Sequence, residues 1–97
     1  MIDGREGVAK DENRAFELVE EGARLGCHHC QGVMAECYRW GHGCVRDDAR
    51  SLELARESSG KGSRYGQCVL GRLYLDGAGG VAQDNAQAFA LYRLASA

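Results

Sequence analysis

Apolar residues recur every three or four positions along most of this chain, a spacing typical of amphipathic α-helices. Glycine-rich stretches interrupt the pattern, whereas proline, which would kink a helix, is absent. The pattern predicts five helical segments, over residues 11–25, 28–40 and 48–59, a fourth that Ser63 caps, and a fifth that starts at Asp84. We therefore expect an all-α fold.

The predicted helices carry many small residues on their inward faces. A glycine in the middle of a helix costs about 1 kcal/mol relative to alanine. Gly71 is such a glycine, and we expect two helices to pass there too closely for a β-carbon. The predicted inward residues are Ala15, Leu18, Val19, Gly22, Ala23, then Cys30, Val33, Met34, Cys37, Tyr38, then Leu52, Ala55, Ser59 with Leu54 at an edge, then Gln67, Leu70, Gly71, Leu73, Tyr74, and finally Ala88, Leu91, Tyr92 and Ala95.

The same arrangement of residues occurs three times. Val8, Val45 and Val81 lie 37 and 36 residues apart, each with a glycine four positions before it and an aspartate three positions after it. This period is typical of stacked helix pairs that contact only their neighbours. We predict one domain over residues 1–97, with units at about 4–40, 41–76 and an incomplete 77–97. The repeat positions that we expect to be structural are Gly26, Tyr38, Gly41, Asp48, Gly62, Gly71, Tyr74, Gly77 and Asp84.

The run Leu70-Gly71-x-Leu73-Tyr74-x-x-Gly77-x-Gly79-Gly80-Val81-x-x-Asp84-x-x-x-Ala88 closely resembles the SEL-one-like repeat (SLR), an α-solenoid family related to tetratricopeptide repeats. The middle unit departs from the family pattern, with Leu52 in place of an alanine and Ser58-Ser59 in place of an alanine pair. The resemblance implies about two and a half units of antiparallel helix pairs in a right-handed superhelix. It also implies a non-catalytic adaptor that holds a peptide or partner protein on its inner face and needs no cofactor.

Charged residues recur at matching positions of the first and third predicted helices: Arg14, Glu17 and Glu21 on the first, and Arg50, Glu53 and Glu57 on the third. Related solenoids line their inner surface with these helices, so the six residues are candidates for a mixed-charge groove; the alternative is that they only keep the surface soluble. Trp40, the single tryptophan, is a candidate anchor for a partner.

Five cysteines support a second hypothesis, from a different class of function. Cys27-His28-His29-Cys30, with Cys37 two turns on, could hold zinc, although a second matching pair of ligands is missing. The disulfide that some relatives form within a helix pair is not expected, because Ala23 stands opposite Cys30. A disulfide between Cys37 and Cys68 is an alternative pairing. The remaining interpretation treats Cys30, Cys37 and Cys68 as small buried apolar residues.

Composition excludes several other classes. The formal charge is −2, from 12 basic and 14 acidic residues without a basic patch, so nucleic acid is not an expected partner. No run of about 18 apolar residues predicts a membrane span, and no leader is recognisable, which makes the cytoplasm the default location. The histidines are expected in solvent, and Gly77–Gly80 lacks the lysine of a phosphate loop, so we expect no enzyme.

The fifth predicted helix ends where a partner helix should begin. Its apolar residues Leu91, Tyr92 and Ala95 would then lack a cover. Since repeat stacks generally need polar caps, we expect the chain either to be part of a longer array or to self-associate through this end.

Overall fold

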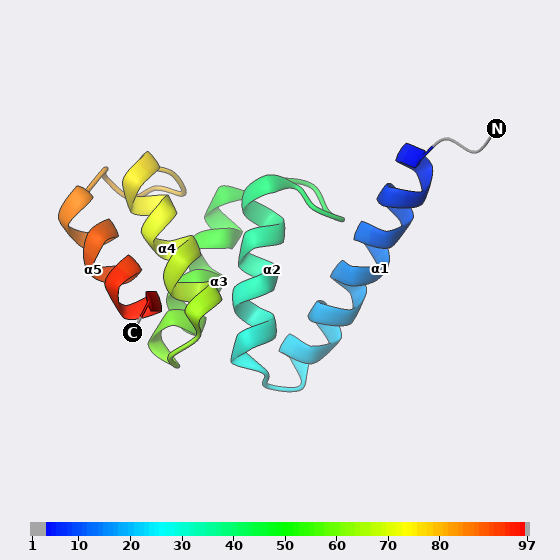
Figure 1. Cartoon of the computed structure of the whole chain (residues 1–97), viewed down its shortest axis with the longest axis horizontal. Helices are drawn as coiled ribbons and strands as arrows, with labels where there is room; N and C mark the ends of the chain where they lie inside the picture. The colour runs from blue at the N-terminus through cyan, green and yellow to red at the C-terminus, as the bar shows by residue number, and fades with distance from the viewer. Residues whose placement is uncertain (1–3, 97) are drawn as a thin grey trace.

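The computed structural model describes the backbone of residues 4–96 and the side chains of residues 13–96. Five helices make up this part of the chain, which contains no strand: α1 (Gly4–Arg24), α2 (His28–Trp40), α3 (Asp48–Gly60), α4 (Arg64–Asp76) and α5 (Asn85–Ser96). They follow one another along an elongated body with extents of 48 × 27 × 23 Å (Figure 1). The predicted all-α fold is confirmed.

Side chains at the start of four helices accept the backbone N–H groups that the helix leaves unpaired. Ser63 and Asp84 do so as predicted, bonding the N–H groups of Gly66 at 3.2 Å and Gln87 at 3.1 Å. At α3 this role belongs to Asp47. At α2 it belongs to the sulfur of Cys27.

The loops after α2 and α4 begin at glycines in the left-handed region, Gly41 with φ +73° and Gly77 with φ +65°. Side chains rarely adopt this conformation, so glycine is favoured where a helix turns off into a loop. The backbone N–H of Gly41 bonds Cys37 O and that of Gly77 bonds Leu73 O, closing each helix end.

The first helix differs from its prediction, because α1 begins at Gly4 instead of Asp11. The two later loops have a second left-handed glycine, Gly43 and Gly79, two positions after the first. Glu6 stands at the matching position of the first unit, where a side chain disfavours that conformation, so the backbone continues as a helix. The side chains of the repeat residues Val8 and Asp11 lie outside the described residues.

The helices form a linear stack. In the described part of the chain, α1 contacts only α2 and α5 contacts only α4, whereas α2, α3 and α4 contact one another. The ends of the stack therefore bury less than expected: Leu18 is 68% exposed and Ala15 is also exposed, although both were predicted to be inward. No other helix of the described chain packs on that face of α1 to cover them.

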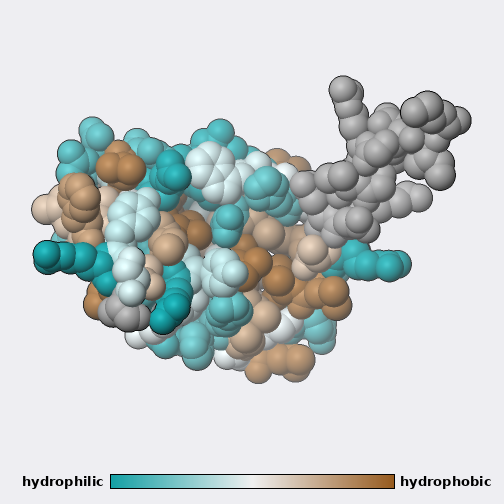
Figure 2. All heavy atoms as spheres, in the orientation of Figure 1, coloured by the Kyte–Doolittle hydropathy of each residue, from teal (hydrophilic) through white to brown (hydrophobic). Residues whose placement is uncertain are grey.

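The prediction for α5 needs a similar correction. Leu91 is buried against α4, while Tyr92 and Ala95 are partly buried, so these residues are not an open outer face. The exposed apolar residues of α5 are Phe89 at 70% and Leu94 at 57%. Figure 2 shows apolar side chains both at the α5 end and along the junction of α1 with α2.

Glycines allow the helices to approach closely. A β-carbon on Gly71 would lie 3.3 Å from the carbonyl oxygen of Ala88 and 3.4 Å from Leu91 Cβ, so α4 and α5 pack closely there, as expected. Two glycines that we did not single out are tighter. A β-carbon on Gly66 would lie 2.7 Å from the Ser59 nitrogen, and one on Gly32 would lie 2.6 Å from the Gly66 nitrogen.

The core lies where α2, α3 and α4 meet, and it extends to α5 through Leu91. Leu52, the departure from the family pattern, is buried there, and Gly79 packs against it. Some buried residues were not predicted: Ser51 and Ser58 are buried on α3 where Ser59 was expected, and Gln31 and Arg39 are buried on α2. The buried apolar residues are Met34, Ala35, Leu52, Leu54, Ala55, Val69, Leu70, Leu73 and Leu91.

None of the described helices is long and apolar enough to cross a membrane.

Candidate functional site

A groove runs between α1 and α3. Both helices pack on α2 without contacting each other, so α2 forms the floor of the space between them. The groove contains a cavity of about 330 Å³. Its lining residues are Glu20, Ala23 and Arg24 from α1, Gln31 and Met34 from α2, and Arg50, Glu53, Leu54 and Glu57 from α3.

The charged side chains along the groove pair with near neighbours on their own helices. Arg24 pairs with Glu21 on α1, and Arg50 Nη1 lies 3.3 Å from Glu53 Oε2 on α3. These side chains are about half exposed or more, and exposed pairs contribute about 0–1 kcal/mol each. A partner's charges could therefore replace them at little cost in stability.

Gln31 is the buried polar residue of the groove floor, at 8% exposed. Its Nε2 donates to Glu57 Oε1 at 3.2 Å, whereas its Oε1 has no hydrogen-bond partner among the described residues. A buried acceptor left without a partner costs about 1–3 kcal/mol, so such a group calls for an explanation.

The structure brings three of the six predicted groove residues into the lining: Arg50, Glu53 and Glu57. Arg14, Glu17 and Glu21 on α1 are exposed and are not among the lining residues. Glu20, Ala23 and Arg24 occupy that side of the groove instead, with Glu21 holding Arg24.

We did not single out Gln31 from the sequence, although a signal for it exists. Gln67 lies 36 residues later, and it is also buried, at 9% exposed. The recurrence of glutamine at the repeat period therefore indicates a buried position, although the polarity of glutamine alone would suggest an exposed one.

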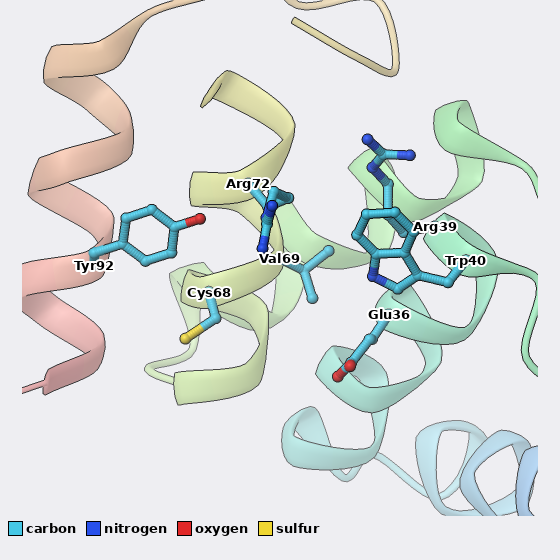
Figure 3. A pocket seen from close by; sticks show the side chains of 7 residues that line it. All are labelled: Glu36, Arg39, Trp40, Cys68, Val69, Arg72 and Tyr92. Atoms are coloured by element: carbon cyan, nitrogen blue, oxygen red, sulfur yellow. The ribbon is translucent and has the colours of Figure 1, made fainter. Parts of the chain in front are cut away.

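A second cavity, of about 160 Å³, lies on α2, α4 and α5 and contains Trp40 in its wall. Figure 3 shows the indole of Trp40 beside Arg39, with Arg72 and Val69 across the cavity. The Arg39 guanidinium carbon lies 4.4 Å from the ring centroid and that of Arg72 lies 5.9 Å away. Trp40 is 45% exposed, so the protein presents an aromatic surface with two cations within about 6 Å of its ring centroid.

Arg39 joins this wall to the core. It is 5% exposed, and its Nη2 lies 2.7 Å from Asp76 on α4 while its Nη1 lies 3.3 Å from Asp48 on α3. Its Nε has no hydrogen-bond partner within the part of the chain that the structure describes. Arg39 therefore orients Trp40 and also links three helices through charge.

The candidate zinc ligands do not come together in the described residues, where no group of three or more His, Cys, Asp or Glu side chains could hold a metal ion. His29 instead packs edge-on against Tyr65, with ring centroids 4.7 Å apart. Cys27, Cys30, Cys44 and Cys68 are free thiols, so Cys68 is not bonded to Cys37. Cys68 is also exposed, contrary to the buried position expected for it.

Cys27 and Cys30 do come together. The Cys30 N–H donates to Cys27 Sγ at 3.4 Å. This bond, with a second one from the Cys30 thiol, lowers the pKa of Cys27 below its ordinary value. The pKa of Cys30 is raised, first because its thiol donates to Cys27. Across from Cys30 lies Gly22 of α1, instead of the Ala23 expected from the sequence.

The family model described as Sel1 repeat matches residues 2–27, 28–63 and 64–97, which together span nearly the whole chain. The chain belongs to the Sel1 repeat family. The resemblance found in the sequence is thereby confirmed. The unit limits that we predicted, 4–40, 41–76 and 77–97, differ from the limits of the matched repeats and stay a prediction. The right-handed superhelix also stays a prediction.

Two solved structures share the Sel1 repeat fold. One is a protective antigen displaying an SLR fold from uropathogenic Escherichia coli, with 27% identity over 87% of this chain and a TM-score of 0.73. The other is a Sel1 repeat protein from Oxalobacter formigenes, with 20% identity over 88% of this chain and a TM-score of 0.76. The match covers 18% and 24% of those longer chains. No curated protein matches the chain.

Sel1 repeats generally serve as scaffolds for protein–protein interaction, and they typically carry no catalytic site or cofactor. A protein partner is therefore the general expectation for this chain.

Proposed function

We propose that this chain is a non-catalytic interaction module that binds an extended peptide segment of a partner in the α1–α3 groove. The observation that carries the proposal is the unpartnered Oε1 of the buried Gln31. An extended peptide offers backbone N–H donors that no secondary structure satisfies. A small movement of the Gln31 side chain would bring the buried Oε1 to one such N–H, while Nε2 keeps its bond to Glu57.

The charges of the groove favour a basic segment. Three glutamates line it against two arginines, and the remaining lining residues are uncharged. Met34 and Leu54 supply an apolar floor for a small aliphatic side chain. We therefore expect the bound segment to combine at least one lysine or arginine with a neighbouring apolar residue.

The experiment is a selection of binders from a random peptide library displayed on phage, followed by affinity measurement on synthetic copies of the selected peptides. We expect them to carry basic residues. Glu53→Lys should weaken them by roughly tenfold or more, because it reverses a charge at the rim. Gln31→Met should also weaken them, because it removes the acceptor and keeps the volume.

The matched control is Glu36→Lys, which makes the same charge change beside Trp40, outside the groove. Glu17→Lys should have a small effect, because Glu17 does not line the cavity. Peptides that bind Glu53→Lys normally but lose affinity for Glu36→Lys would move the binding site to the Trp40 cavity and refute the proposal.

A further inference from the structure

A pair of cysteines separated by two residues lies at the start of α2. Cys27 is the residue that caps the helix, and its extended backbone (φ −76°, ψ 107°) places its sulfur over the first turn. Cys30 is the third residue of the helix, and its N–H donates to Cys27 Sγ at 3.4 Å. The Cys27 sulfur therefore lies against the first turn of the helix, beside Cys30.

The two thiols differ in the way that thiol–disulfide exchange requires. Cys27 is exposed and lies at a helix N-terminus, where N–H groups and the helix dipole stabilise a thiolate. Cys30 is partly buried beside it and keeps its proton more firmly. An accessible thiolate with a protonated thiol in contact is the arrangement of an attacking and a resolving cysteine.

Gly22 on α1 makes room for the resolving sulfur. A β-carbon on Gly22 would lie 2.5 Å from Cys30 Sγ, closer than two such atoms can approach. The Cys30 sulfur therefore occupies a notch in α1 at Gly22.

We propose that Cys27 and Cys30 form a dithiol that exchanges with a disulfide of another molecule. The Cys27 thiolate attacks one sulfur of that disulfide, which forms a mixed disulfide and releases the other half as a thiolate that takes a proton from water. Cys30 then loses its proton to water and attacks Cys27 Sγ. This forms the Cys27–Cys30 disulfide and releases the second half. Two electrons pass from the pair to the substrate, and the reverse sequence restores the dithiol.

The test uses the reduced full chain and glutathione disulfide as the probe, with acid quenching and peptide mass mapping over time. We expect the wild type to form the Cys27–Cys30 disulfide with only a transient mixed disulfide. Cys30→Ser should stop at a glutathione adduct on Cys27. Cys27→Ser should leave Cys30 slow to react, and the control Cys68→Ser, which changes another exposed cysteine, should behave as wild type.

Two results would overturn the proposal: a Cys27 in Cys30→Ser that reacts no faster than Cys68, or a wild type that stays at the mixed disulfide. Rates that rise after treatment with a chelator would also overturn it, because a metal would then be holding the thiols.

Gly22→Ala provides a second variant that keeps both thiols. Its β-carbon displaces the Cys30 sulfur, so we expect the first attack to be unchanged and the mixed disulfide to persist roughly tenfold longer. The control is Gly60→Ala, since a β-carbon on Gly60 meets nothing within 4 Å. Equal lifetimes in wild type and Gly22→Ala would show that the notch does not position Cys30.

Discussion

Arg39 is a buried cation that pairs with aspartates on two neighbouring helices, and its role could not be predicted from its own neighbourhood. It lies on a helix face that looks like ordinary solvated surface in the sequence, and its partners Asp48 and Asp76 are 9 and 37 residues away. Only the stacking of α2, α3 and α4 brings the three side chains together.

We expect Arg39→Met to lower the free energy of unfolding by about 2–4 kcal/mol, because it leaves Asp76 without its cation and leaves Asp48 with only the exposed Arg46. Chemical denaturation measures the loss. Arg50→Met is the control, since its pair with Glu53 is exposed and should contribute less than about 1 kcal/mol. Equal losses in the two variants would contradict the role of Arg39.

The cysteines should differ in their reaction with iodoacetamide as the pH falls. The pKa of Cys27 is lowered by hydrogen bonds, so its thiolate persists below the ordinary pKa of 9.0. The pKa of Cys44 is raised by burial, so its thiolate is lost first as the pH decreases. Rates followed by mass spectrometry should therefore show a lower midpoint for Cys27, and the opposite order would contradict the hydrogen-bonded arrangement.

At the scale of helices, the hydrophobic pattern predicted α2 to α5 closely, because each carries an apolar face between glycine turns. The pattern failed at the start of α1, which begins at Gly4 instead of Asp11. It also overlooked Gly32 and Gly66, because a close approach between helices depends on how they cross and has no periodic signal. Half of the groove escaped prediction for the same reason: the rotation of α1 follows from its packing on α2.

Gly66→Ala should destabilise the protein by about 1–3 kcal/mol, because its β-carbon would overlap the backbone at the end of α3. Thermal unfolding followed by circular dichroism measures this change. Gly60→Ala, with open space around the new methyl group, should be neutral or slightly stabilising. A neutral Gly66→Ala would indicate that α3 and α4 are farther apart than described.

For the whole molecule, the repeat period predicted a stack of helices, and the stack explains where apolar surface remains. Leu18 on α1 and Phe89 on α5 lie at opposite ends and are each about 70% exposed. Neither end is covered within the described chain, because each terminal helix of a linear stack has a neighbouring helix on one side only.

Self-association through the α5 end therefore stays a prediction. We expect light scattering after size-exclusion chromatography to show a concentration-dependent rise in mass, which Phe89→Glu removes because a charge cannot be buried in an apolar contact. Leu18→Glu is the control at the other end. A monomer at all concentrations would contradict the prediction.

The single attachment of α1 has a mechanical consequence. A tension applied between the two ends of the chain would act on α1 through its contact with α2 alone, whereas the middle helices resist through three mutual contacts and the Arg39 charges. We therefore expect α1 to detach from α2 at a low force, while α2, α3 and α4 remain packed against one another. A partner bound between α1 and α3 would contact both helices and so raise the force needed to detach α1.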